Sequence, residues 1–441
     1  MSDPASRHER FATLPGGLAP LGYRNFSIYL SGFALSNIGR WIELTGAVWL
    51  ASELTSSLLL LGLIGIFRGV PNILLSPIAG VIADRVDQRR MVQVTQALSL
   101  LASLVMGILV ISGVAELWHL YVQITIQASI NSFDAAVRQA LFPRLAPRPL
   151  LGEAVTLHST AARSARLIGP AIGGVAIATF GEGAPFLLNA VSFVALLVGV
   201  AFIRGVPPRT AVAGSTIRTE LTDGLRMMLA IPVLRGLLQL EFVNALFSLS
   251  PVMITIIGRT VLDVGPEGLG GLLAAPALGA LIGIAIILTF GQTRRQGRFL
   301  VLTSIANAAV FVVFGLATDY HLAFVALVAL GLSDALIGVT RQNIAHHAAP
   351  SRMRGRVMAN MGTVTRGINP LSEAQAGALA GVIGGPTAVL VAAAALGAAA
   401  AWTGRTNPAL WGFLREDAED PEDPPRLAAS HRTAEPPTSA R

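Results

Sequence analysis

Acidic residues interrupt several long apolar runs of this 441-residue chain, among them Glu43, Asp134, Glu241 and Glu373. A carboxylate removed from water has a raised pKa, so it can take up and release a proton near neutral pH. We therefore interpret these four residues as candidates for proton coupling. Asp134 has Arg138 four residues on, and Glu43 follows Arg40 by three. Side chains at these spacings meet on one helix, so a purely structural ion pair is the alternative interpretation of both.

Other side chains in the same runs are candidates for contact with a small molecule. Arg40 and Arg166 are basic groups in apolar surroundings, where an ionised side chain usually faces a cavity or a partner. The uncharged candidates for lining such a cavity are Phe33, Phe133, Phe242 and Asn244.

Several kinds of chemistry are excluded by composition. The chain has no cysteine, which rules out disulfides, thiolate catalysis, iron–sulfur clusters and cysteine-based zinc sites. All 32 basic residues are arginine, so a Walker A lysine and a Schiff-base lysine are also absent. The adjacent pair His346 and His347 would point to different sides of a helix. We expect no enzyme activity, no cofactor and no metal site.

The segments that contain these residues are predicted to be transmembrane helices. A bilayer core of about 30 Å needs about 20 apolar residues of helix. The chain is 53% hydrophobic and 13% charged, with a mean hydropathy of +0.64. We predict an all-α membrane protein with twelve transmembrane helices, at residues 26–50, 58–83, 91–114, 117–141, 154–180, 185–203, 233–257, 268–290, 299–318, 321–345, 357–383 and 386–402.

Arginine is unevenly distributed among the connections between these helices. The even-numbered connections carry clusters such as Arg85, Arg89 and Arg90, whereas the odd-numbered ones are acidic, uncharged or mixed. Positively charged loops stay in the cytoplasm, so we expect a multi-pass protein of the cell (inner) membrane with both termini cytoplasmic. The net charge of +7 then reflects topology. No loop is long enough for a nucleic-acid-binding module, so no nucleic-acid partner is expected.

The chain divides into two related halves. Arg138-Gln139 and Arg341-Gln342 are followed at equal spacings by Pro147 and Gly152 in the first half and by Pro350 and Gly355 in the second. Repeated halves around a pseudo-two-fold axis are typical of transporters, with the substrate site between them. We expect a cytoplasmic segment at 1–20, six-helix halves at 21–203 and 233–402, a cytoplasmic linker at 204–232 with an amphipathic helix over 221–229, and a disordered cytoplasmic tail at 403–441.

A resemblance to a known family rests on the run from Gly80 to Arg90. This run resembles the signature loop of the major facilitator superfamily, with Asp87 and Gln88 departing from the common pattern. Further runs resemble the branch that contains enterobactin exporters and related efflux permeases, at 53–57, 138–143, 168–174, 186–193 and 354–357. The resemblance covers roughly residues 21–402.

The resemblance implies roles for two groups of residues. A cytoplasmic gate would be formed by Gly80, Asp84, Arg85, Arg89, Arg138 and Arg356, with Asp84 close to Arg138 and to the start of the eleventh helix. In the fifth helix, Gly169, Pro170, Gly173 and Gly174 resemble a motif of proton-driven exporters. We expect this motif at a contact between the halves, against the seventh, eighth or tenth helix. A glycine-rich packing seam is the alternative.

Together, these features predict a secondary active transporter that is a monomer in the lipid bilayer. We expect proton-coupled export of a small organic molecule, a siderophore or an amphipathic drug, by alternating access. One alternative is an uptake carrier or facilitator of the same fold. Another is a non-transporting membrane scaffold or sensor.

Overall fold

The computed structural model describes residues 16–83, 85–203, 226–350 and 354–414, and among these it contains helices and turns but no strand. Some side chains between 355 and 370 also lie outside the description. A short 3-10 helix covers Gly16–Gly22. The α-helices are α1 (Arg24–Leu54), α2 (Leu58–Ala83), α3 (Gln88–Ile111), α4 (Leu117–Leu141), α5 (Leu151–Phe180), α6 (Ala184–Phe202), α8 (Pro232–Leu246), α9 (Pro251–Thr260), α10 (Pro266–Phe290), α11 (Gln296–Gly315), α12 (Tyr320–Ala348), α13 (Arg354–Ile383), α14 (Gly385–Thr406) and α15 (Pro408–Trp411).

Seven of the described helices are long and apolar enough to cross a membrane, and eight if α8 and α9 form one bent span. This confirms the expected all-helical membrane fold. The four helices α1, α4, α5 and α13 are also long, with 31, 25, 30 and 30 residues, but they do not pass the same test of composition. These four carry most of the charged side chains that the sequence singled out.

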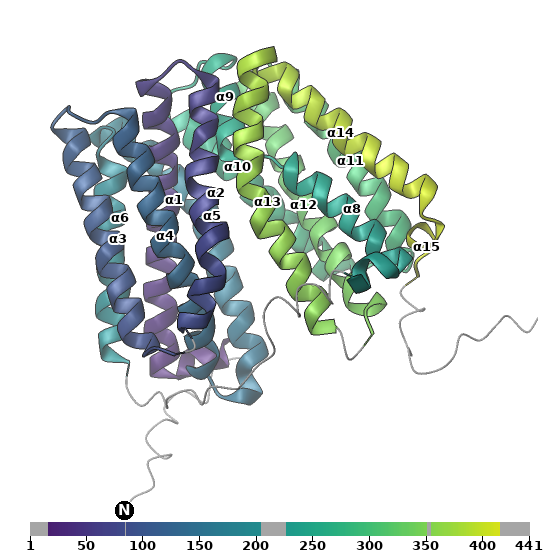
Figure 1. Cartoon of the computed structure of the whole chain (residues 1–441), viewed down its shortest axis with the longest axis horizontal. Coiled ribbons are helices and arrows are strands. Elements are labelled where there is room, and N and C mark those ends of the chain that lie inside the picture. Colours follow the sequence, from purple (N-terminus) through teal and green to yellow (C-terminus); the bar gives the residue numbers. More distant parts are fainter. Residues whose placement is uncertain (1–15, 84, 204–225, 351–353, 415–441) are drawn as a thin grey trace, which may run out of the picture.

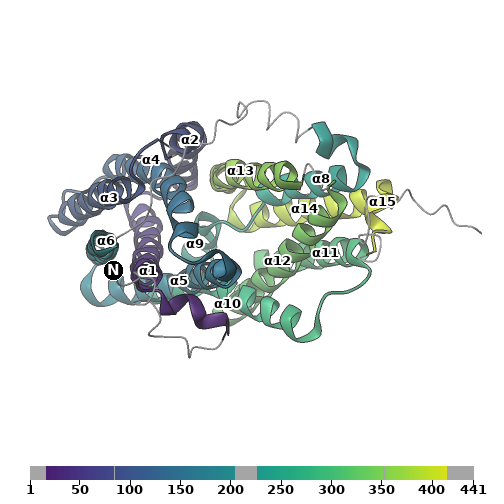
Figure 2. The same ribbon diagram turned by 90° about the horizontal axis from the view of Figure 1, so that it is seen from below.

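The helices form two lobes, α1–α6 and α8–α15 (Figure 1). We call the end of the bundle at which α6 ends and α8 begins the connector end, and the opposite end the far end. The most extensive contacts between the lobes are made by two helix pairs, α2 with α13 and α5 with α10, which lie side by side in Figure 2 as well. Helix α9 also contacts α1 and α2. Toward the connector end the two lobes diverge (Figure 1).

Glycines allow the backbones of the two lobes to touch at the far end. A Cβ atom added to Gly377 of α13 would lie 2.3 Å from the Cα atom of Gly62 in α2. A Cβ atom added to Gly174 of α5 would lie 2.4 Å from the carbonyl oxygen of Pro266, at the start of α10. Side chains larger than hydrogen would therefore force the lobes apart. Small residues at such contacts are typical of helix packing in membranes.

The continuous helix predicted at 233–257 is wrong, because α8 and α9 are separate and meet at 41°. Pro251 has no backbone N–H and therefore cannot continue the hydrogen bonding of α8. The Ser250 side chain accepts a hydrogen bond of 3.1 Å from the Met253 backbone N–H and caps the start of α9. The pair Ser250-Pro251 is thus a helix start inside an apolar run.

The second lobe continues beyond the boundary drawn from the sequence. Residues 403–411, assigned to a disordered tail, belong to the end of α14 and to α15. Asn407 joins these helices to α8: its side chain accepts from the Leu410 backbone N–H at 2.9 Å and donates to the Pro232 carbonyl at 2.6 Å. The rest of the expected tail, beyond 414, and most of the linker with its amphipathic helix, at 204–225, lie outside the described residues.

Candidate functional site

A cavity of about 400 Å³ lies within the first lobe and is rich in amide side chains. Helical periodicity explains the lining: Asn37, Trp41 and Leu44 of α1 recur three to four residues apart. The same spacing brings Gln123, Gln127 and Asn131 to one face of α4. The lining comprises Asn37, Arg40, Trp41, Glu43, Leu44, Ala47, Arg68, Asn72, Ser99, Gln123, Ile124, Gln127, Ala128, Asn131, Asp134, Asn189 and Phe193.

Glu43 is a buried carboxylate at the wall of this cavity, surrounded by neutral donors. Its Oε1 atom accepts from the Gln123 amide at 2.6 Å and from the Gln127 amide at 3.5 Å. Its Oε2 atom accepts from the Ser103 hydroxyl and the Asn189 amide. Within the described part of the chain, no arginine or histidine forms a salt bridge with it. A hydroxyl can rotate from donor to acceptor, so the Ser103 side chain can also accommodate a protonated Glu43.

Asp134 is held in a different way, because two arginines share it. It forms a salt bridge with Arg138 on its own helix, and Arg40 of α1 lies 3.9 Å away. Its other oxygen accepts from the Thr95 hydroxyl at 3.0 Å and the Gln96 amide at 2.9 Å. Asp134 and Arg138 are both buried, so this pair is not exposed to solvent although it lies near the end of α4.

The aromatic candidates Phe33, Phe133 and Phe242 line neither this cavity nor the smaller cavity of the second lobe, which is described below. Phe33 lies in an aromatic cluster, with its ring centroid 4.0 Å from that of His158 and the Arg138 guanidinium 5.7 Å away. Phe133 and Phe242 are sequence neighbours of Asp134 and Glu241. Adjacent residues of a helix point about 100° apart, so both phenyl rings turn away from the carboxylate beside them. The Phe242 side chain is 52% exposed.

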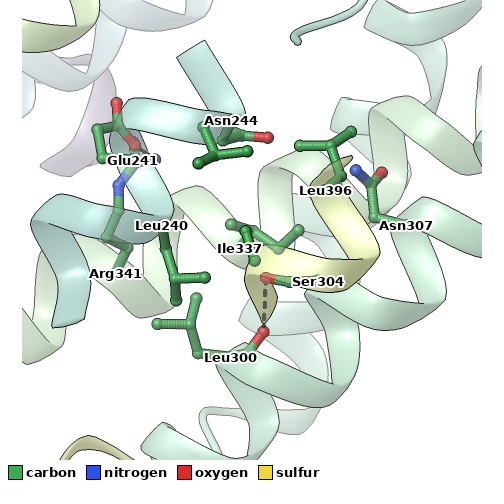
Figure 3. Close-up of a pocket in the computed structure, with 11 residues that line it drawn as sticks. Leu240, Glu241, Asn244, Leu300, Ser304, Asn307, Ile337, Arg341 and Leu396 are labelled. Atoms are coloured by element: carbon green, nitrogen blue, oxygen red, sulfur yellow. Dashed lines mark hydrogen bonds and ion pairs between the residues drawn. The ribbon is translucent and has the colours of Figure 1, made fainter. Parts of the chain in front are cut away.

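In the second lobe, Glu241 of α8 forms a salt bridge with Arg341 of α12, and both side chains point toward one another in Figure 3. They line a cavity of about 20 Å³, together with Asn244, Ser304 and Asn307. Such a volume holds about one water molecule, not an organic ligand. Asn307 accepts a hydrogen bond from the Ser333 hydroxyl at 2.6 Å.

Among the described residues, two salt bridges join the lobes. Arg68 of α2 pairs with Glu373 of α13, and the Oε2 atom of Glu373 is buried without a hydrogen-bond partner among the described residues. At the far end, Arg259 of α9 bonds to Glu53 of α1 at 2.6 Å and stacks on the Trp49 ring at 4.3 Å. Glu373 was expected to be a candidate for proton coupling, but its pairing with Arg68 and the pairing of Glu53 with Arg259 were not predicted. The signal for Arg68 was its position as a single cation in the apolar run of α2.

The expected gate is only partly described. Asp84 and the Arg356 side chain lie outside the described residues. Arg89 donates to the carbonyl groups of Val200 and Ala201, at 3.3 Å each, and thus binds the end of α6 in its own lobe. Arg85 is exposed, and nothing lies within 4 Å of a Cβ atom added to Gly80. Arg138 is engaged by Asp134.

The glycine motif of α5 faces two neighbours. Gly174 and the Pro170 carbonyl lie against α10, where that oxygen would be 2.6 Å from a Cβ atom added to Gly270. Gly169 and Gly173 instead lie against α1 of the same lobe, so their expected position between the halves is wrong. Consecutive helical residues point in different directions, which lets one short motif serve both contacts.

Arg166, one turn before this motif, is exposed and lies over the Trp41 ring at 5.4 Å. Asp334 of α12 lies within electrostatic range of this arginine, so the two lobes carry opposite charges there.

A two-lobed helical bundle with a polar cavity in apolar surroundings defines the class of the protein: a membrane transporter. Residues 15–432 match the family described as transmembrane secretion effector, so the chain belongs to this branch of the major facilitator superfamily. The resemblance drawn from the loop at Gly80–Arg90 is thereby confirmed. The relatives are transporters, not enzymes.

Three relatives illustrate the range of the family. The uncharacterized MFS-type transporter YfiS of Bacillus subtilis (strain 168) is 26% identical over 380 residues, covering 82% of this chain and 88% of YfiS. The multidrug efflux pump Tap of Mycolicibacterium fortuitum is 23% identical over 78% of this chain and 87% of Tap. The enterobactin exporter EntS of Shigella boydii serotype 18 is 22% identical over 64% of this chain and 67% of EntS.

Among solved structures, a bacterial homologue of the human lysosomal transporter Spinster has the same fold. Its inward-facing, unoccupied form superimposes with a TM-score of 0.67 at 13% identity. The superposition covers 90% of this chain and 99% of that one.

Proposed function

We propose that this protein is a proton-coupled exporter of a small organic molecule that works as a monomer by alternating access. In this proposal, α1, α4, α5, α13 and the bent pair α8–α9 cross the membrane in addition to the seven apolar helices. The protein then has twelve transmembrane spans, in two six-helix halves related by a pseudo-two-fold axis. Residues 21–203 form the first half, and the second half, drawn from the sequence as 233–402, extends to the end of α15 at 411. The observation that carries the proposal is Glu43, a buried carboxylate at the wall of a polar cavity with no salt bridge among the described residues.

The conformation corresponds to the inward-open state of such a cycle. Backbone contacts at Gly62–Gly377 and Gly174–Pro266 hold the lobes together at the far end, whereas the lobes diverge at the connector end. Arginines 85, 89 and 90 follow α2 at the connector end, so the distribution of positive charge supports a cytoplasmic location for this end and for both termini.

Glu43 is the first choice for the proton carrier. Asp134, Glu241 and Glu373 each have an arginine partner, which offsets their charge without a proton. Glu43 has no salt bridge among the described residues, so protonation is the direct way to neutralise it, and an ion crosses apolar surroundings at a large cost. Protonation from the outside would let the empty carrier return, and loss of the proton to the cytoplasm would reset it. Glu241 is the second choice, because its span is the counterpart of α1 in the second half.

A siderophore or an amphipathic drug is the proposed cargo. The names of an enterobactin exporter and a multidrug efflux pump among the relatives support this range. The cavity of about 400 Å³ offers both amide and apolar side chains to such a molecule. Facilitated diffusion or uptake through the same fold is the alternative outcome.

Everted membrane vesicles test this proposal. Respiration acidifies the interior of these vesicles. When a substrate is added outside, a proton-coupled exporter moves it inward in exchange for protons from the lumen. A pH-sensitive dye reports the resulting rise in lumenal pH. We expect proton release with wild type for at least one compound of a panel of siderophores and drugs. Glu43→Gln should abolish it, and the control Glu153→Gln, at the start of α5, should not. Entry of a compound that stops at the outside concentration and is unaffected by a protonophore would favour facilitated diffusion.

A further inference from the structure

We propose that Arg68 binds an anionic oxygen group of the transported molecule, and that Glu373 occupies this arginine when the carrier is empty. The cargo then carries a carboxylate or a group of the same charge. This inference rests on the proposed transport function. It assigns to Glu373 the role of a counter-ion, in place of the role of a proton carrier.

The position of Arg68 meets the requirements of a binding residue. Its side chain lines the cavity of the first lobe and is 34% exposed, whereas its partner Glu373 is 2% exposed. A cargo molecule in the cavity can therefore reach the guanidinium group but not the carboxylate. A guanidinium group presents several N–H donors in a planar fork that matches a carboxylate, so one anionic group can replace another there.

The remaining charges of the cavity favour an anion over a cation. Asp134 is held by Arg138 and lies near Arg40, and Glu43 is enclosed by four neutral donors. Among the described lining carboxylates, Asp134 is thus engaged by arginine, and Glu43 is only 8% exposed with both oxygens already hydrogen-bonded, so Arg68 is the more accessible charged group. The Arg40 side chain is 29% exposed and adds a second positive group. The amide groups of Asn72 and Asn131 can donate further hydrogen bonds to oxygen atoms.

Binding at Arg68 also explains how an occupied cavity opens at the far end. The Arg68–Glu373 pair ties α2 to α13 about a turn and a half from the Gly62–Gly377 contact. If the cargo takes Arg68, Glu373 stays buried between the lobes without its cation, which is strongly unfavourable. Separation of the lobes at the far end exposes Glu373 to water. After release of the cargo, Glu373 pairs with Arg68 again, and no proton is needed in this exchange.

A cysteine cross-link measures whether the far end is closed. A Cβ atom on residue 381 would lie 3.5 Å from the Leu59 Cβ atom, within the range for a disulfide between α13 and α2. The chain has no native cysteine, so Leu59→Cys with Gly381→Cys gives the only thiol pair. In this background, Glu373→Gln should slow oxidative cross-linking of the purified protein in lipid nanodiscs by roughly threefold or more. The control Glu153→Gln should not.

Citrate serves as the carboxylate probe, with its uncharged trimethyl ester and the cation tetraphenylphosphonium as matched comparisons. We expect citrate alone to slow cross-linking, with the effect lost in Arg68→Gln but kept in Arg68→Lys and in the exposed-site control Arg148→Gln. Monodisperse elution establishes that each variant is folded. No effect of citrate, an effect that survives in Arg68→Gln, or an unchanged rate in Glu373→Gln would overturn the inference. The assay uses no proton gradient, so failure of proton coupling in vesicles would leave its result standing.

Discussion

At the scale of single residues, two buried carboxylates, Glu241 and Glu373, each form a salt bridge with an arginine of another helix. The sequence located Glu241 and Glu373 because each interrupts an apolar run. Their partners Arg341 and Arg68 lie 100 and 305 residues away along the chain. Such pairs depend on helix packing, which one sequence does not reveal. By contrast, the pair of Asp134 and Arg138 was visible, because its spacing of four residues brings both side chains together on one helix.

The Glu241–Arg341 pair predicts a stability effect. Arg341→Gln leaves a buried carboxylate without its arginine, and breaking such a pair costs about 3 kcal/mol. We expect this loss in the free energy of unfolding measured by detergent titration. The double variant Glu241→Gln/Arg341→Gln should recover part of it, and Arg148→Gln should be close to wild type. Equal destabilisation in the single and double variants would show that the arginine acts by packing and not by charge.

Replacement of Glu43 should separate cargo binding from proton coupling. In Glu43→Gln the side chain cannot lose a proton, while its size and its contacts with Ser103 and Asn189 are largely retained. We expect cargo binding to persist and accumulation driven by a pH gradient to disappear. Binding followed by tryptophan fluorescence and transport in vesicles measure the two properties separately. Normal accumulation in this variant would move the role of proton carrier to another residue.

At the scale of helices, the sequence predicted most boundaries, because apolar runs end at charged or glycine-rich turns. It failed at α8–α9, where Pro251 and the cap from Ser250 interrupt a run that is apolar throughout. It also failed to separate the two faces of the α5 motif. Gly173 and Gly174 are neighbours in the chain, and only packing shows that the first faces α1 and the second α10.

Because Gly173 faces α1 and Gly174 faces α10, we expect leucine to have different effects at these two positions. Gly174→Leu places a side chain against the backbone of α10 and should prevent closure of the far end, with slower cross-linking between positions 59 and 381. Gly173→Leu disturbs packing inside the first lobe and should lower the yield of folded protein. The control Gly338→Leu of α12 has open space around its Cβ position and should change neither property. Rapid cross-linking in Gly174→Leu would show that this contact does not determine closure.

At the scale of the whole molecule, the helical fold was predictable from the long apolar runs, and the family was predictable from the loop at Gly80–Arg90. The conformation did not, because it depends on small differences in contact between the lobes. The far-end pair of Arg259 with Glu53 is one such contact. Arg259→Gln removes its charge and its stacking on Trp49, so we expect fewer closed molecules and slower cross-linking between positions 59 and 381. An unchanged cross-linking rate would show that this salt bridge does not stabilise the closed far end.

If a proton gradient alone drives export, purified protein in proteoliposomes should concentrate its cargo without any other source of energy. The lumen is made acidic, no nucleotide is present, and the cargo is the compound that releases protons in everted vesicles. We predict accumulation in the lumen above the outside concentration, loss of the gradient as cargo enters, and neither in Glu43→Gln. Equal concentrations on both sides with wild type, regardless of the imposed pH gradient, would contradict the account.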